Sequence, residues 1–280
     1  MLKYVFFGTP QFADTVLRKL ISSGLPPTAI VCNPDRPLGR KQTVTPPPTK
    51  VTATSHEIPC FQPVKLSEVK AELEKINPDV FVVAAFAKII PAFILAIPRL
   101  GTIGVHPSLL PKYRGASPIQ SVLLAGETET GVTLYMMDER IDHGPMIARR
   151  KYTVENSKYY LDAEKDLAGI GADLLMKTLP KLTEGTIKPI PQDESRATFT
   201  KKFITDDGFV DEQDLLATQR GDNPEKAREV FNKMRALNPE PGVWTLKDGK
   251  RIKLLKAKLV DGKLELTKIQ KEGRTPETIF

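Results

Sequence analysis

The chain has 280 residues, of which 40% are hydrophobic, and a formal net charge of +7 at pH 7. This length allows one large hydrophobic core and a second, smaller unit. No uncharged apolar run approaches the roughly 18 to 20 residues of a membrane span, and the first run is too short for a signal peptide, so we expect a cytoplasmic protein with no membrane partner.

The first half of the chain alternates between strand and helix patterns. Leu2 to Phe7 is a short apolar run that predicts a strand, and Phe12 to Leu20 carries apolar residues at helical spacing. Further strands are predicted over 29–32, 80–84, 102–105, 132–137 and 146–152, with helices over 51–56, 69–76 and 161–182. Continuous apolar strands separated by helices are typical of a parallel sheet covered on both faces, so we expect an α/β domain.

Between Pro34 and Pro48 the sequence becomes basic and rich in proline. It carries Arg36, Arg40 and Lys41 and ends in three consecutive prolines. Because proline lacks a backbone donor and fixes φ, we expect no regular structure here but an exposed loop that leaves the second strand of the sheet. Loops of this length in a compact domain are often functional.

The second half begins with a break at Pro189 to Arg196, where prolines and polar residues predict a linker. After it, a helix is predicted over 225–237 and strands over 243–246, 251–259 and 264–269, with Asp248-Gly249 and Asp261-Gly262 as hairpin turns. The last stretch is rich in lysine and arginine. Such a surface either contacts RNA or is merely solvated, and composition alone leaves both possibilities open.

Reactive groups are expected around His106 and Asp142. His106 follows a predicted strand, at the end where reactive groups of open parallel sheets gather, and Asp142 lies in a tight turn between two strands. On residue type alone, His106 could be a hydrogen-bonded structural residue and Asp142 an ordinary turn residue. The turn at Gly8 lacks the Gly-x-Gly-x-x-Gly spacing of a dinucleotide site.

The sequence predicts no metal site. The histidines, His56, His106 and His143, are not paired with cysteines at ligand spacing. Cys32 and Cys60 are too few for a disulfide framework, and we interpret them as buried thiols in a reducing compartment.

Two segments resemble the signature of the folate-dependent formyltransferases. They are GTIGVHPSLLPKYRGASP over 101–118 and MMDERIDHGPM over 136–146. The resemblance covers most of the chain, including FGTPQF at 7–12, DRPLGR at 35–40, FQP at 61–63 and AFAKIIP at 85–91. Beyond the predicted linker, ATF at 197–199 and RALNPEPG at 235–242 resemble the carboxyl-terminal domain of methionyl-tRNA formyltransferases, whereas sugar formyltransferases share only the catalytic half.

This resemblance implies a Rossmann-like formyltransferase domain with a parallel-rich sheet over 1–188, a linker over 189–203 and a shortened, OB-like, tRNA-binding β-barrel over 204–280. It also implies transfer of a formyl group from 10-formyltetrahydrofolate to the α-amino group of initiator methionyl-tRNA, for translation initiation, by a monomer. Two alternatives stay open. One is an N-formyltransferase that acts on an amino-sugar nucleotide, and the other is a non-catalytic protein that binds folate or tRNA.

By the same resemblance, His106 exchanges protons, while Asp142 fixes the tautomer of the imidazole and stabilises its cation. The folate co-substrate is expected to contact Ser108, Leu109, Leu110, Pro111, Ala85, Phe86, Ala87, Lys88, Ile89, Met137 and Asp138. The tRNA is expected to contact Arg36, Arg40, Lys41, Lys250, Arg251 and Lys253.

The sequence departs from the family in two places. Formyltransferases normally carry an asparagine two residues before the histidine, which donates a hydrogen bond to the formyl oxygen, and this chain has Gly104 there. Loss of one such donor costs about 10² to 10³ in rate, so either a backbone amide, a water or another side chain such as His143 substitutes, or the enzyme is slow or inactive. The chain also ends soon after the strand over 264–269, so we expect a truncated barrel.

Overall fold

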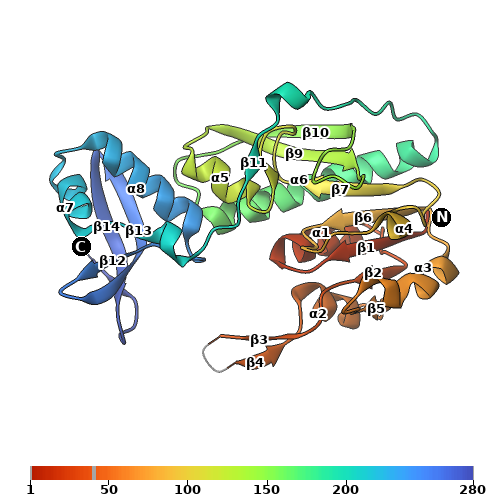
Figure 1. The fold of residues 1–280 in the computed structure, drawn as a ribbon, viewed down its shortest axis with the longest axis horizontal. Coiled ribbons are helices and arrows are strands. Elements are labelled where there is room, and N and C mark those ends of the chain that lie inside the picture. Colours follow the sequence, from red (N-terminus) through yellow and green to blue (C-terminus); the bar gives the residue numbers. More distant parts are fainter. Residues whose placement is uncertain (1, 40–41, 280) are drawn as a thin grey trace. The chain divides into compact units, whose positions relative to one another are not determined.

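The computed structural model describes residues 2–39 and 42–279, which form two compact units (Figure 1). The amino-terminal unit contains the residues up to Gly115 together with Gly131–Tyr152 and Glu164–Phe199. The carboxyl-terminal unit contains Ala116–Thr130, Thr153–Ala163 and the residues from Thr200 onward. No helix in the two described ranges is long and apolar enough to cross a membrane.

A seven-stranded sheet of order β10-β9-β7-β6-β1-β2-β5 forms the centre of the amino-terminal unit. The strands are β1 (Tyr4–Gly8), β2 (Ala29–Val31), β5 (Cys60–Phe61), β6 (Val80–Ala84), β7 (Thr102–His106), β9 (Glu129–Met136) and β10 (Met146–Thr153). The strands from β5 to β7 are parallel neighbours, whereas β9 runs antiparallel to β7. The expected parallel-rich, Rossmann-like sheet is therefore confirmed, with antiparallel pairing added beyond β7.

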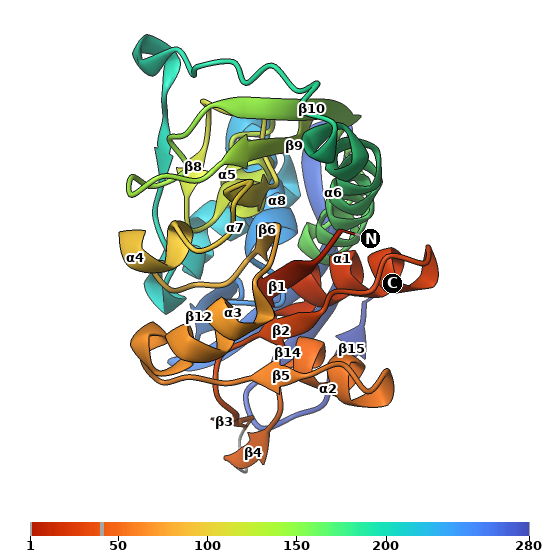
Figure 2. The ribbon, with the colours of Figure 1, turned by 90° about the vertical axis from the view of Figure 1, so that its right-hand side faces the viewer.

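Helices lie on both faces of this sheet, with α1 and α6 on one side and α3 and α4 on the other (Figure 2). Their bounds are α1 (Gln11–Ser22), α2 (Pro48–Ser55), the 3₁₀ turn η1 (Leu66–Val69), α3 (Lys70–Ile76), α4 (Ala92–Leu95) and α6 (Tyr160–Thr183). Phe7 and Phe81 on neighbouring strands have ring centroids 4.9 Å apart and pack in one core with Leu73 and Ile94. Each fully buried side chain of this size contributes about 1.5 to 3 kcal/mol, and this core holds the strands in place.

The proline-rich segment after β2 contains two short strands, so the expectation that its prolines prevent regular structure is wrong. β3 (Arg36–Leu38) and β4 (Thr43–Thr45) form an antiparallel ribbon in which Pro37 lies opposite Val44. β3 pairs with β4 alone, and an edge strand tolerates proline because half of its backbone donors face away from the partner. Arg40 and Lys41, which were predicted to contact tRNA, lie outside the described residues.

The carboxyl-terminal unit combines helices with a four-stranded antiparallel sheet. Its elements are α5 (Pro118–Leu124), the 3₁₀ turn η3 (Thr205–Gly208), α7 (Glu212–Arg220), α8 (Pro224–Leu237), β12 (Trp244–Lys247), β13 (Lys250–Val260), β14 (Lys263–Lys271) and β15 (Glu277–Thr278). Asp248, Gly249, Asp261 and Gly262 all have positive φ, as type I′ hairpin turns require, so both predicted turns are confirmed. This sheet is consistent with the expected small, shortened barrel-like domain.

The helix α7 was not predicted from the sequence, although its capping signals are present. Asp211 accepts hydrogen bonds from the backbone of Gln213 and Asp214, and Gly221 ends the helix in the left-handed conformation. The strands and helices that the sequence did predict are confirmed, and their ends differ from the predicted ones by at most three residues.

A buried arginine joins the segments of the carboxyl-terminal unit. Arg235 of α8 is 2% exposed and donates to the backbone carbonyls of Lys158 and Glu155 at 2.9 and 3.0 Å. The hydroxyl of Tyr159 also bonds to the backbone of Ala257 in β13. The residues at 153–163 therefore belong to this unit even though they are distant from it in the sequence.

Candidate active site

The structure brings together the two residues on which the sequence argument depends. His106 is the last residue of β7, and Asp142 lies in the turn between β9 and β10. The Nδ1 atom of His106 lies 3.6 Å from Oδ2 of Asp142, with side chains that are 7% and 17% exposed. The pair is therefore nearly enclosed but still reachable from solvent.

The hydrogen bonds of His106 indicate which of its nitrogens is available for chemistry. Nε2 lies 2.8 Å from the carbonyl oxygen of Tyr113. Because a carbonyl can only accept, Nε2 must carry a hydrogen, which leaves Nδ1 as the nitrogen that can gain or lose a proton. Nδ1 faces the Asp142 carboxylate.

Asp142 is held from three directions. Oδ1 accepts from the hydroxyl of Tyr135 at 2.6 Å, and Oδ2 accepts from the backbone N–H of Gly115 at 2.7 Å. The carbonyl oxygen of Asp142 accepts from Nε2 of Gln192 at 2.8 Å. Its φ is 47°, in the left-handed region that aspartate tolerates better than most residues. These contacts determine where the carboxylate points.

The space over Gly104 is filled by Tyr135, which the sequence argument did not consider. Gly104 of β7 and Tyr135 of β9 are paired across the two strands. A Cβ atom added to Gly104 would lie 2.3 Å from Cε1 of Tyr135. His143, the alternative donor that the sequence suggests, bonds to Asp138 through Nδ1 at 2.6 Å and to Arg140 through Nε2 at 3.0 Å.

The segment that was expected to be a linker contributes to the wall of this site. It carries the 3₁₀ turn η2 (Glu194–Arg196), and its end, β11 (Phe199–Thr200), pairs with β8 (Arg114–Gly115). Arg114 is 1% exposed, and its guanidinium donates to Gln192 Oε1 and to both carboxylate oxygens of Glu194. These hydrogen bonds hold the pKa of Glu194 below its ordinary value. Sequence reasoning missed these residues because nothing local connects 114 with 192–194.

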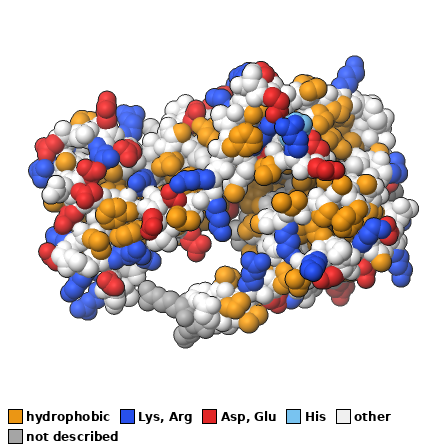
Figure 3. All heavy atoms as spheres, viewed as in Figure 1, with side chains coloured by type: hydrophobic (Ala, Val, Ile, Leu, Met, Phe, Trp, Pro, Cys, Tyr) orange, Lys and Arg blue, Asp and Glu red, His pale blue; other side chains and the backbone are white. Residues whose placement is uncertain are grey.

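Exposed and buried residues alternate directly after β6. Ala85 and Ala87 have φ values of 47° and 60°, and both are exposed, while Phe86 between them is buried. Lys88 donates to the carbonyls of Pro63 and Val64, and burial, reinforced by the charge of Arg36, lowers its pKa. Ile89 is 83% exposed. Several groups of exposed hydrophobic side chains lie on the face shown in Figure 3.

The other residues predicted to contact folate divide into buried and accessible groups. Ser108 and Leu110 are buried, and the Ser108 hydroxyl donates to the Lys112 carbonyl at 2.6 Å. Leu109 and Pro111 are partly exposed, as are Met137 and Asp138. The buried residues shape the loop after His106, while the accessible ones are able to contact a ligand.

Basic and aromatic side chains meet in the carboxyl-terminal unit. The guanidinium of Arg251 lies 3.7 Å from the ring centroid of Trp244, and Phe209 packs against the same ring with centroids 4.8 Å apart. Lys253 is opposite Trp244 across β12 and β13. Lys250 and Arg36, in their separate units, are exposed. The aromatic residues were not predicted to belong to a site, although aromatic interleaving is a signal for nucleic-acid contact.

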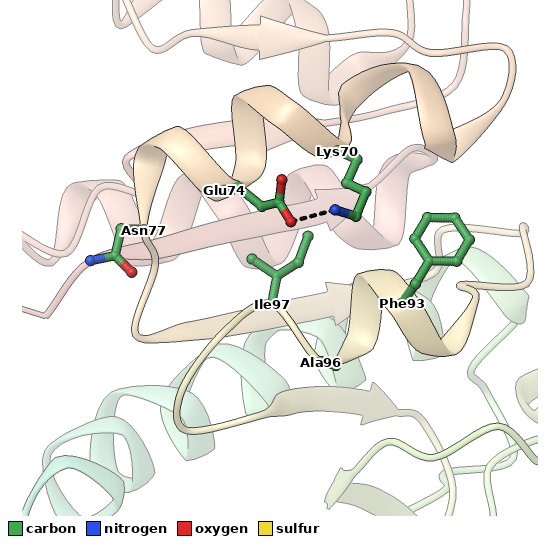
Figure 4. A pocket seen from close by; sticks show the side chains of 6 residues that line it. All are labelled: Lys70, Glu74, Asn77, Phe93, Ala96 and Ile97. Atoms are coloured by element: carbon green, nitrogen blue, oxygen red, sulfur yellow. Dashed lines mark hydrogen bonds and ion pairs between the residues drawn. The ribbon is translucent and has the colours of Figure 1, made fainter.

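A surface pocket between α3 and α4 contains none of the predicted site residues. Its lining is Lys70, Glu74, Asn77, Phe93, Ala96 and Ile97 (Figure 4). Asn77 and Ile97 precede β6 and β7, whereas His106 ends β7. Within residues 2–39 and 42–279 no cluster of three or more histidine, cysteine, aspartate or glutamate side chains could hold a metal ion.

Comparison with known families gives matches over both halves of the chain. A family model described as "Formyl transferase" matches residues 2–179, and one described as "Formyl transferase, C-terminal domain" matches 224–279. A Staphylococcus aureus (strain MW2) protein named methionyl-tRNA formyltransferase is 39% identical over 280 residues, covering 99% of this chain and 85% of the relative.

Solved structures share the fold at low sequence identity. A sugar N-formyltransferase from a Shewanella species is 16% identical with a TM-score of 0.68, covering 93% of this chain and 100% of that chain. An N-formyltransferase from Helicobacter canadensis, in complex with folinic acid and dTDP-3-aminofucose, is 20% identical with a TM-score of 0.64, covering 93% of this chain and 89% of that chain.

Proposed function

Because this chain belongs to the formyl transferase family, we propose that it transfers the formyl group of 10-formyltetrahydrofolate to the α-amino group of initiator methionyl-tRNA in the cytoplasm, for translation initiation. The full-length match to a methionyl-tRNA formyltransferase supports this acceptor. The match over 224–279 adds support, because the sequence resemblance associates this half with tRNA rather than with sugars.

The observation that carries the proposal is the approach of His106 to Asp142. Attack of the amine on the formyl carbon forms a C–N bond, and the bond from that carbon to N10 of the folate then breaks. The amine must lose a proton and the departing nitrogen must gain one. The 3.6 Å separation is longer than a hydrogen bond, so Nδ1 of His106 is free to exchange this proton while the Asp142 carboxylate stabilises the imidazolium. General acid–base catalysis of this kind is typically worth about 10² to 10⁴ in rate.

We assign the folate to the segments 85–89, 108–111 and 137–138. Ala85 and Ala87 are exposed, so their segment is accessible to a flat heterocycle, and exposed Ile89 offers an apolar surface. Buried Ser108 and Leu110 then act by holding the loop rather than by touching the ligand.

We assign the tRNA to Arg36 and to the basic strand β13, with Lys250, Arg251 and Lys253. Lysine and arginine side chains bind the phosphates of a nucleic-acid backbone, and an aromatic ring stacked with arginine offers a surface for unpaired bases. The contacts of Trp244 support this assignment. Arg40 and Lys41 stay predictions, as do the monomeric state and the division into 1–188, 189–203 and 204–280.

The decisive experiment incubates the purified chain with charged initiator tRNA and 10-formyltetrahydrofolate and measures formylmethionine. A parallel reaction offers a dTDP-amino sugar, and a His106→Gln variant serves as the inactive control. We expect formylated methionyl-tRNA and an unmodified sugar. Formylation of the sugar alone would identify an amino-sugar enzyme, and folate binding without turnover would identify a non-catalytic homologue.

A further inference from the structure

An aromatic side chain lies over the glycine that precedes His106 by two residues. Cβ atoms essentially never approach other heavy atoms within 3.0 Å, yet one added to Gly104 would lie 2.3 Å from Cε1, 2.5 Å from Cζ and 2.8 Å from the hydroxyl oxygen of Tyr135. Residues two apart on a strand share a face, so Gly104, His106 and the paired Tyr135 all present to the same side of the sheet. The hydroxyl end of Tyr135 therefore fills the space that a side chain at 104 would need.

That hydroxyl is directed at Asp142. It donates to Oδ1 at 2.6 Å, while the Gly115 N–H donates to Oδ2, the oxygen nearest His106. Burial raises the pKa of Tyr135 well above its ordinary value, and the negative charge of Asp142 raises it further, so the phenol keeps its hydrogen at neutral pH. The single hydroxyl hydrogen is committed to Asp142.

We propose that Tyr135 is a positioning residue of the formyl-transfer site, whose ring occupies the space over Gly104 and whose hydroxyl orients Asp142 toward His106. The inference rests on the proposed function of the site. The terminal torsion of an aspartate side chain is soft, so the direction of the carboxylate depends on its hydrogen-bond donors. With the Tyr135 hydroxyl gone, only the Gly115 N–H would hold the carboxylate, and Oδ2 would no longer stay facing Nδ1.

The test is Tyr135→Phe, which keeps the ring over Gly104 and removes only the hydroxyl. We expect kcat for formylation to fall about ten- to hundredfold, with KM for 10-formyltetrahydrofolate and the melting temperature little changed. In an Asp142→Asn background the same substitution should add almost nothing, because the tyrosine acts through the carboxylate. The matched control is Tyr152→Phe, which removes a 2.7 Å tyrosine–aspartate hydrogen bond to Asp166 elsewhere in the unit and should leave kcat unchanged.

A second measurement does not depend on turnover. The ring signals of His106 in an NMR spectrum, assigned with His→Gln variants, should move in Tyr135→Phe and in Asp142→Asn but not in Tyr152→Phe. His106 signals that move in Asp142→Asn alone, or a wild-type kcat in Tyr135→Phe, would overturn the inference. A protein that formylates no methionyl-tRNA but shows the expected shifts would overturn the proposed function and leave the positioning role intact.

Discussion

Arg114 and Glu194 form a two-point ion pair although 80 residues separate them in the sequence. Nη1 of Arg114 lies 3.0 Å from Oε2 of Glu194, and Nη2 lies 2.6 Å from Oε1. The same guanidinium donates to Gln192, which in turn donates to the carbonyl of Asp142. The turn that carries Asp142 is therefore hydrogen-bonded to a segment that the sequence predicts to be a linker.

Replacing Glu194 by alanine should weaken the hydrogen bonds that connect Arg114, Gln192 and the turn that carries Asp142. Gln192 would lose the anchored guanidinium that fixes its amide, and the turn that carries Asp142 would move. Because small misplacements of catalytic groups cost up to about 10² in rate, we expect a roughly tenfold or greater fall in kcat in the formylmethionine assay. Glu184→Ala, which removes an exposed acid of the same unit, is the control, and equal rates for the two variants would refute the link.

The charge of this pair also gives stability a definite pH dependence. Hydrogen bonds from Arg114 hold the pKa of Glu194 below its ordinary 4.5. A carboxylate with a depressed pKa stabilises the fold above its unfolded pKa and loses that effect as pH falls through the folded value. Urea unfolding should therefore find wild type more stable than Glu194→Gln at neutral pH, with the difference closing below about pH 4.5. A difference that is constant down to pH 3 would contradict this.

Substitutions of His106 and Asp142 should have non-additive effects on kcat. His106→Gln and Asp142→Asn should each lower kcat by about 10² to 10⁴, and the double variant should be little worse than the slower single one. Folate affinity, measured by fluorescence titration, should stay within about twofold. The exposed His56 provides the control substitution His56→Gln. Independent, additive losses would show that the two residues act in separate steps.

Gly104 should tolerate no side chain while Tyr135 is present. Gly104→Ala would force its methyl group against the ring, and overpacking of this kind typically costs about 1 to 3 kcal/mol in the free energy of unfolding. Gly104→Asn should be worse and should lower formylation further rather than restore a missing donor. In a Tyr135→Val background, which removes the ring, Gly104→Ala should be nearly neutral. If Gly104→Ala still lowered the free energy of unfolding by the full amount in that background, a group other than Tyr135 would be clashing with the methyl group.

Arg251 should contribute one phosphate-type contact to tRNA binding. We expect Arg251→Ala to weaken binding of methionyl-tRNA and to reduce the slope of log K against log salt by about one unit, with no change in folate affinity. Filter binding at several salt concentrations measures both quantities. Lys181→Ala, an equal change of charge at the end of α6, separates a local contact from a general loss of positive charge. Equal effects of the two variants would argue against a site on β13.

Local pattern in the sequence was enough for most of the secondary structure, whereas the roles expected of His106 and Asp142 came from the resemblance to a known family. Apolar runs such as Val80–Ala84 need only hydrophobic periodicity, and the two Asp-Gly turns need only the φ preferences of their residues. The ribbon β3-β4 escaped prediction because proline was judged by its missing donor alone. That donor matters only where a partner strand would need it.

The surroundings of His106 and Asp142 are decided by tertiary structure. That Gly104 has no room for a side chain depends on the pairing of β7 with β9, which places Tyr135 opposite it. That Glu194 reaches Arg114 depends on the chain returning along β8 after a long excursion. Periodicity reports which face of an element is buried, but the identity of a neighbour is set by strand pairing and packing between distant segments, and no local pattern contains that information.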